Sequence, residues 1–232
     1  MKFNFKFIIF ILLTLSITLT NKGFLYAKEN NDIFNKLLSK GDVMVTEYSV
    51  TATFNSKEND DVLCKEIINR ASNVLGNLEY TSTDENGLVT ISFSSEFYKG
   101  SIVSRPYNGE FIVNVTIIKR ENKNNTKELQ GKLSEILSHV NSRMNYSQCI
   151  KGKILNNNLD EINKFVIDTL EQNKAENINT AKLYNGYSTI CNAKLYNSKK
   201  IGGLDIDFQC AVVKYSSGCY LIMGTPEITL AY

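Results

Sequence analysis

The chain has 232 residues, of which 43% are hydrophobic, and it contains 12 Tyr, 12 Phe and only two Pro. This composition excludes a disordered tail or linker and indicates a folded chain, long enough for one domain with a sizeable core or for two small lobes. Its 26 basic and 24 acidic residues nearly balance, whereas a nucleic-acid-binding protein normally carries a basic excess that neutralises phosphates.

Residues 1–27 have the layout of a secretory signal peptide. Lys2 and Lys6 form a cationic start, an apolar run follows over residues 7–19, and Ala27 ends a more polar segment. The apolar run of about 13 residues is shorter than the roughly 20 that a membrane-spanning helix needs, which favours cleavage after Ala27. Leu25 stands where a small residue is usual, so retention of this segment as a membrane anchor stays open. We expect an extracytoplasmic protein, either secreted or membrane-associated through this segment.

Cleavage after residue 27 would change the charge balance. It would remove three lysines and no acid, which leaves 23 basic and 24 acidic residues and a net charge of −1. We therefore expect no nucleic-acid partner, and contact with a membrane only through an uncleaved N-terminal segment.

Two helices and a strand are predicted at the start of the exported part. Residues 31–40 form a short amphipathic helix that Gly41 ends, and residues 61–76 form a longer one that Gly76 ends. Between them, residues 44–54 alternate between apolar and polar side chains, as in a strand with one buried face. The apolar positions of this strand are Met44, Tyr48, Val50, Ala52 and Phe54. The buried stripe of the longer helix is expected to be Leu63, Cys64, Ile67, Ile68, Ala71, Val74 and Leu75.

A β-meander and a further helix follow. Residues 78–119 change to a period of two and contain turn signals, which predicts three or four antiparallel strands. Residues 126–143 return to helical spacing. The buried stripe of that helix is expected to be Leu129, Leu133, Ile136, Leu137, Val140 and Met144.

From Tyr146 the same order of elements recurs, with a strand, an amphipathic helix over residues 158–172 and further strands through residue 223. Single residues match at an offset of 98, as Tyr48-Ser49 does with Tyr146-Ser147, and Phe111 matches Phe208 at an offset of 97. Accidental recurrence of two generic strand-helix units stays open. The expected organisation is a signal peptide over 1–27, an N-terminal helix within 28–42 and half-repeats over 43–144 and 145–232.

This order of elements is that of the TATA-box-binding-protein fold, in which two half-repeats form one curved antiparallel sheet with helices on its convex side. The exported part resembles the YwmB family of exported proteins from Gram-positive spore formers, which is similar to that fold. The resemblance rests on the N-terminal segment, the first helix, the two strand-helix units and the ending LIMGTPEI at residues 221–228. It implies an α+β envelope protein, with sporulation or cell-wall metabolism as its expected setting, and supplies no catalytic or ligand residues.

The sequence contains no recognisable catalytic constellation. Serine and cysteine hydrolases need a base beside the nucleophile, and the sole histidine, His139, falls off the apolar stripe of its helix, where we expect an exposed side chain. No nucleotide-binding glycine pattern is present, and Lys199 to Gly203 is interpreted as a hairpin turn. We therefore expect no enzyme activity, no metal and no cofactor.

Two alternatives stay open. A glycosidase needs only two carboxylates, and Asp205 and Asp207 lie on one predicted strand face, with Glu47 as a partner from another strand. An enzyme of cell-wall glycan turnover is thus the alternative function. The five cysteines are Cys64, Cys149, Cys191, Cys210 and Cys219. The last three fall on three successive predicted strands, where a cross-strand disulfide could form.

The most informative surface is the sheet face away from the helices. Its polar positions offer hydroxyls and amides with little net charge, which suit a protein, peptide or glycan of the cell envelope. An open sheet that is simply wet on one side is the alternative reading. The candidate binding residues are Thr51, Thr53, Thr90, Ser92, Asn114, Thr116, Asn192, Lys194, Asp207 and Gln209. The expected function is a noncatalytic exported binding or assembly protein.

Overall fold

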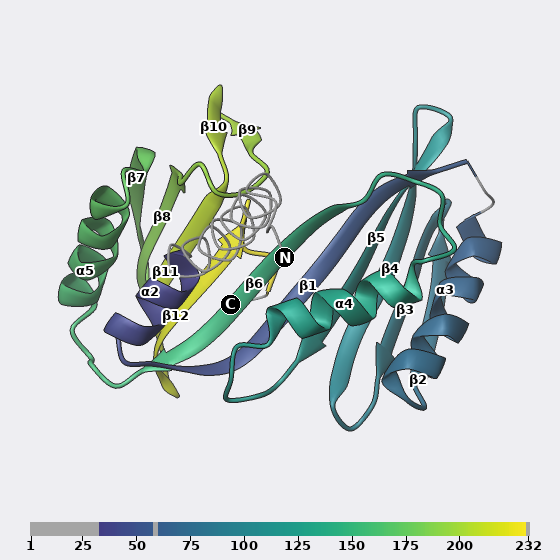
Figure 1. The fold of residues 1–232 in the computed structure, drawn as a ribbon, viewed down its shortest axis with the longest axis horizontal. Coiled ribbons are helices and arrows are strands. Elements are labelled where there is room, and N and C mark those ends of the chain that lie inside the picture. Colours follow the sequence, from purple (N-terminus) through teal and green to yellow (C-terminus); the bar gives the residue numbers. More distant parts are fainter. Residues whose placement is uncertain (1–32, 58–59, 231–232) are drawn as a thin grey trace, which may run out of the picture.

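The computed structural model describes residues 33–57 and 60–230. In this part of the chain, four helices accompany a ten-stranded antiparallel sheet and a separate two-stranded hairpin (Figure 1). The α+β class expected from the sequence is therefore confirmed. The signal segment expected over residues 1–27 lies outside the described residues.

The elements follow the predicted order. The first part of the chain contains α2 (Ile33–Lys40), β1 (Val43–Ser56), α3 (Asp60–Leu75), β2 (Glu79–Glu85), β3 (Leu88–Ser94), β4 (Tyr98–Tyr107), β5 (Glu110–Lys119) and α4 (Thr126–Ile136). The second part contains β6 (Asn145–Ile154), α5 (Leu159–Gln172), β7 (Glu176–Leu183), β8 (Gly186–Asn192), β9 (Lys199–Ile201), β10 (Leu204–Ile206), β11 (Phe208–Tyr215) and β12 (Gly218–Thr225). The strands β9 and β10 pair with each other, so the hairpin turn predicted at Lys199 to Gly203 is confirmed.

The two halves of the large sheet have equivalent strand orders when each half is read outward from the centre. The order is β2-β3-β4-β5-β1-β6-β12-β11-β8-β7, with the antiparallel pair β1 and β6 at the centre. Outward from this pair, β5 has the position of β12, β4 that of β11, β3 that of β8 and β2 that of β7. Phe111 lies on β5 and Phe208 on β11, which hold different positions in this order, so the predicted match between these two residues is wrong.

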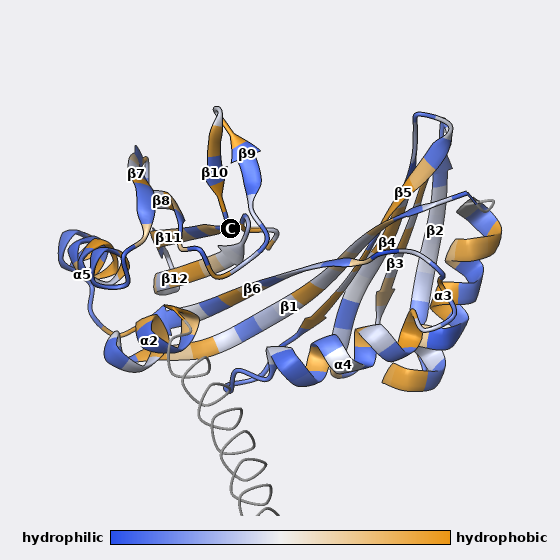
Figure 2. Ribbon diagram, turned by 45° about the horizontal axis from the view of Figure 1, so that its top comes forward, coloured by the Kyte–Doolittle hydropathy of each residue, from blue (hydrophilic) through white to orange (hydrophobic). Residues whose placement is uncertain are grey.

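One main core lies between the sheet and its helices. The helices α3 and α4 pack on the first half of the sheet and α2 and α5 on the second, and Figure 2 shows the ends of the sheet rising away from α2 and α4. The stripe predicted on α3 is buried or packed against this core, as expected from its helical spacing. On α2, Phe34 packs edge-on against Phe208, with 5.4 Å between ring centroids.

Two local predictions are wrong. Met44 is 54% exposed and Val45 is buried, because a β-bulge between Val45 and Glu47 reverses the alternation at the start of β1. The helix predicted over 126–143 ends at Ile136, after which the chain turns and returns to the centre of the sheet as β6. Val140 and Met144 still pack against the core from this returning segment.

Candidate functional site

The first half of the sheet, together with β6, carries an ordered array of hydroxyl groups on the face away from the helices. Cross-strand register places one Ser or Thr on each of six successive strands in a single row. This hydroxyl row consists of Thr81, Ser92, Ser101, Thr116, Thr51 and Ser147, from β2 to β6. Neighbouring strands lie about 4.8 Å apart, so the six side chains are regularly spaced across the sheet.

A second row runs parallel to the first, two residues further along each strand. It consists of Thr83, Thr90, Val103, Asn114, Thr53 and Asn145. Only Val103 in this row is apolar, so the two rows together form a nearly uncharged polar surface. We call the two rows together the hydroxyl face.

Hydrogen bonds between side chains order the centre of the hydroxyl face. The hydroxyls of Thr51 and Thr116 are 2.8 Å apart, and the Thr53 hydroxyl donates to Asn114 Oδ1 at 2.7 Å. Thr51 is only 7% exposed, whereas Ser92 and Thr81 towards the edge are exposed. The groups that are free to meet a ligand therefore lie mainly on β2 and β3.

The structure brings together the six first-half residues that the sequence predicted, Thr51, Thr53, Thr90, Ser92, Asn114 and Thr116. It adds residues that the sequence reasoning missed, namely Thr81, Thr83, Ser101, Asn145 and Ser147. The alternation of Thr81 and Thr83 was the signal that could have identified β2, but registers between strands are not visible in one sequence.

The four second-half candidates do not extend this surface. Lys194 lies beyond the end of β8, is exposed and forms an ion pair with Glu176. Asn192, the last residue of β8, accepts the Lys194 backbone N–H at 3.0 Å. Gln209 lies on β11, but its Oε1 accepts the backbone N–H of Ile228 at 3.0 Å and its Nε2 donates to Ser188.

Asp207 is a structural carboxylate and not a surface residue, which corrects its assignment to the open face. It is fully buried, at the one-residue break between β10 and β11. Its carboxylate accepts the backbone N–H groups of Ala193, Leu195 and Tyr196, the last two at 2.9 and 3.1 Å. Asp207 therefore holds the loop that leads into the β9–β10 hairpin.

The other two acids proposed for catalysis are engaged elsewhere. Asp205 forms an ion pair with Lys200 at 3.1 Å, and Glu47 accepts the Arg120 Nε–H at 3.0 Å. Glu47 lies on β1, three strands from the β11 strand that follows Asp207, which is about 14 Å at the usual strand spacing. Glycosidase carboxylates stand about 5 to 10 Å apart, so the structure does not assemble this pair.

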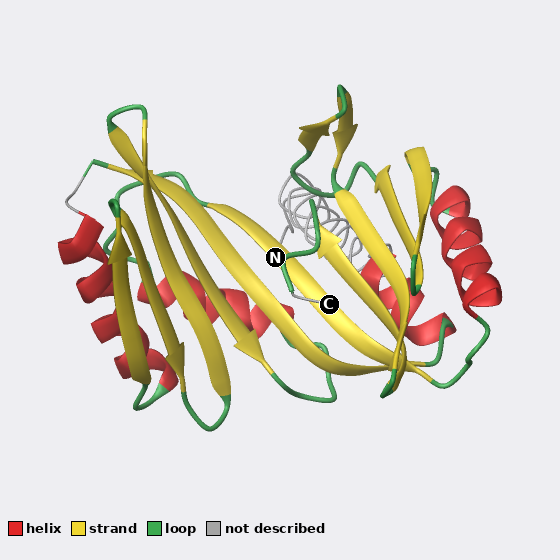
Figure 3. Cartoon of the chain, turned by 180° about the vertical axis from the view of Figure 1, so that it is seen from behind, coloured by secondary structure: helices red, strands yellow, loops and turns green. Residues whose placement is uncertain are grey.

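In the second half, the segment 226–230 returns over the face away from the helices (Figure 3). It forms a second, smaller core there, made of Cys149, Ala211, Val213, Ile222 and Leu230. The backbone N–H groups of Thr229 and Leu230 reach the Cys149 thiol, whose pKa burial nevertheless raises to about 11. Beside this core, the Lys151 ammonium lies 5.5 and 5.4 Å from the ring centroids of Tyr215 and Tyr220.

The histidine and the cysteines do not form a reactive centre in the described residues. Both ring nitrogens of His139 are buried, so the exposed side chain expected there is wrong; the helix ends before it, and the ring nitrogen Nε2 lies 3.6 Å from Glu66. All five cysteines are buried, and none forms a disulfide with another described residue, so the cross-strand disulfide that the sequence left open is not formed. Burial also raises the pKa of Cys191, to about 12, with the nearby Asp207 charge as a smaller cause.

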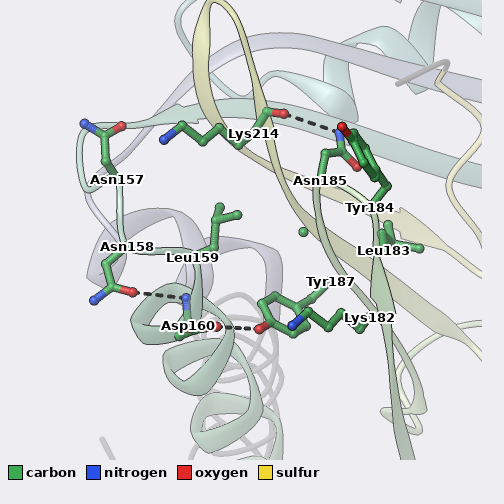
Figure 4. Close-up of a pocket in the computed structure, with 11 residues that line it drawn as sticks. Asn157, Asn158, Leu159, Asp160, Lys182, Leu183, Tyr184, Asn185, Tyr187 and Lys214 are labelled. Carbon is green, nitrogen blue, oxygen red and sulfur yellow. Dashed lines mark hydrogen bonds between the residues drawn. The ribbon is translucent and has the colours of Figure 1, made fainter.

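A cavity of about 610 Å³ lies apart from the hydroxyl face, between the start of α5 and the β7–β8 hairpin (Figure 4). The Asn158 side chain caps α5 there by accepting the backbone N–H groups of Asp160 and Glu161. The Tyr187 hydroxyl donates to Asp160, and this hydrogen bond raises the tyrosine pKa. The polar groups at the helix start are thus already paired with one another, and the cavity does not present them to a ligand.

Within residues 33–57 and 60–230, no cluster of His, Cys, Asp and Glu could hold a metal ion. No helix in the same ranges is long and apolar enough to cross a membrane. No protein-family model and no curated protein matches this chain.

Proposed function

We propose that this chain is a noncatalytic exported binding or assembly protein of the cell envelope that acts through the hydroxyl face. The observation that supports this proposal is the row of six hydroxyl side chains across β2 to β6, on the face that the helices leave uncovered. A partner with many hydrogen-bonding groups and little charge, such as a protein segment or a glycan chain, suits this chemistry. Export by residues 1–27 would place the face where such partners occur.

The strand order is consistent with two half-repeats that form one saddle-shaped sheet, as in the TATA-box-binding-protein fold. We include that relationship, and membership of the YwmB family, in the proposal. In DNA-binding members of that fold, the concave face carries basic residues and apolar wedges. The corresponding rows here are hydroxyls and amides, which favours a partner other than nucleic acid.

The test is retention of the purified protein on cell-wall material. We expect the wild-type protein to be retained without releasing soluble wall fragments. Ser92→Arg should weaken retention at least tenfold, because it places a bulky charge at an exposed position of the hydroxyl row. Ser138→Arg is the matched control, since Ser138 is exposed beyond the end of α4 and away from the hydroxyl face. Equal retention of the two variants would contradict the proposed surface, and release of wall fragments would support the enzyme alternative.

A second test addresses export. We expect the full-length protein to be found outside the cytoplasmic membrane, either secreted or attached to it. Full-length protein found soluble in the cytosol, with residues 1–27 intact, would contradict the proposed location.

A further inference from the structure

The strand β2 is an unprotected edge of the sheet. All seven of its residues, Glu79 to Glu85, are exposed, and all seven pair in continuous register with β3. In the described residues no strand pairs with the other side of β2. Alternate residues of an edge strand point their backbone N–H and C=O groups outward, so β2 presents a template on which a further strand can pair.

The opposite edge of the sheet, β7, is protected. Its register with β8 is interrupted between Glu176 and Asn179, and Asn177 has a positive φ of 55°. Glu176 is held in an ion pair with Lys194. Bulges of this kind hinder a further strand from pairing along an edge. Of the two edges of the large sheet in residues 33–57 and 60–230, β2 is the one that offers a regular seven-residue template.

The charged side chains of β2 indicate which kind of added strand would complement it. Its charged residues are Glu79, Asp84 and Glu85, all acidic, and none of them forms an ion pair with a described residue. Between these ends, the uncharged centre of the strand consists of Tyr80, Thr81, Ser82 and Thr83. An antiparallel strand with basic residues at both ends and small or β-branched residues in the middle would complement this pattern.

Pairing with a second copy of the chain is disfavoured by the same charges. If two β2 strands paired antiparallel over all seven residues, Ser82 would face Ser82, and each Glu79 would face Glu85 of the partner copy. Like charges directly opposite each other destabilise a strand pair. The acids therefore select against self-association while they attract a basic segment.

We propose that β2 binds an extended, basic segment of a partner protein by strand addition, which would enlarge the sheet to eleven strands. The backbone of β2 would supply the hydrogen bonds, and Glu79 and Glu85 would choose the register through basic residues at the two ends of the added strand. This inference concerns the edge of the sheet and does not rest on the function proposed for the hydroxyl face.

The test uses the purified chain and a blocked seven-residue peptide with lysine at positions one, two and seven, threonine at three and five, and valine at four and six. We expect the peptide to bind and to protect β2 amides, but not β7 amides, from hydrogen exchange. A peptide of the same sequence with alternate backbone N-methyl groups should bind at least tenfold more weakly, because it keeps the charge but cannot pair.

Charge reversal tests the register. Glu79→Lys with Glu85→Lys should weaken binding of the lysine peptide at least tenfold. It should create binding of a peptide with glutamate in place of lysine at positions one and seven, with the lysine at position two kept opposite Asp84. Glu135→Lys with Glu171→Lys is the matched control, because it changes the net charge equally at exposed positions on α4 and α5. Should the first double variant fail to fold, the exchange measurement on the wild-type chain decides.

Three results would overturn the proposal. The first is equal binding of the lysine peptide to both double variants, and the second is protection of β7 in place of β2. The third is protection of β2 that grows with protein concentration when no peptide is present, which would identify a second copy as the partner.

Discussion

On the face away from the helices, the first half of the sheet presents the hydroxyl row, whereas the second half presents Ile222, Ala211 and Val213 beneath the segment 226–230. Both halves have the same strand order outward from β1 and β6. The halves also differ in their connections, because β3 and β4 are joined by residues 95–97, whereas residues 193–207 join β8 to β11 and include the β9–β10 hairpin. Equal strand order thus does not give equal surfaces, since the segments that return over a face decide whether it is available.

The largest change in the free energy of unfolding should come from removing the Asp207 carboxylate, which holds the loop between β8 and β9. Asp207→Ala removes a buried charge and leaves three backbone N–H groups without their acceptor, so we expect it to lower the free energy of unfolding by about 3 to 5 kcal/mol. Asp205→Ala, two residues away in an exposed ion pair, should cost about 0.5 kcal/mol or less. Urea denaturation at neutral pH measures both. Similar losses for the two variants would show that Asp207 does not organise this loop.

A smaller change in the free energy of unfolding should distinguish the two halves of the sheet on the face away from the helices. Ile222→Ala removes a fully buried side chain beneath the returning segment and should cost about 3 kcal/mol. Ile112→Ala is the matched substitution on the first half, where the side chain is only partly buried, and should cost about 1 kcal/mol. Urea or thermal denaturation compares them. If the two costs are equal, the second core contributes no more than the open face does.

The smallest change in the free energy of unfolding should follow from weakening the packing of the segment 226–230 on the sheet. Leu230→Ala should cost about 2 kcal/mol, at the low end for a buried leucine, because Leu230 lies outside the strands and keeps 5% of its surface exposed. The same change should expose Cys149, whose pKa burial raises to about 11, and should speed its alkylation at pH 8. Peptide mapping after timed labelling measures this rate. Cys64, on α3 in the first-half core, is the internal control, and equal acceleration at both thiols would indicate general unfolding instead.

Much of the fold could be predicted from local patterns. Period-two alternation identified the strands β1, β3 and β5, and helical spacing identified α3. The turn signal at Lys199 to Gly203 identified the β9–β10 hairpin. The bulge at Val45 was not predictable, because a single extra residue leaves the surrounding alternation intact on each side. The end of α4 at Ile136 depended on the path back to β6, which the helical spacing of residues 137–143 does not reveal.

The candidate site, too, was predictable from the sequence only in part. By itself, the sequence determined which side chains share a face wherever a strand has no bulge or break, because that follows from the pleat of one strand. Only the tertiary structure decided that six hydroxyls would align in one row, since alignment depends on register between strands that are far apart in the chain. Only the tertiary structure, too, turned Asp207 inward and covered Gln209. Both outcomes come from segments that pack back onto the sheet. Which polar groups these segments bury depends on contacts between residues that are distant in the sequence, so it is decided only in the folded molecule.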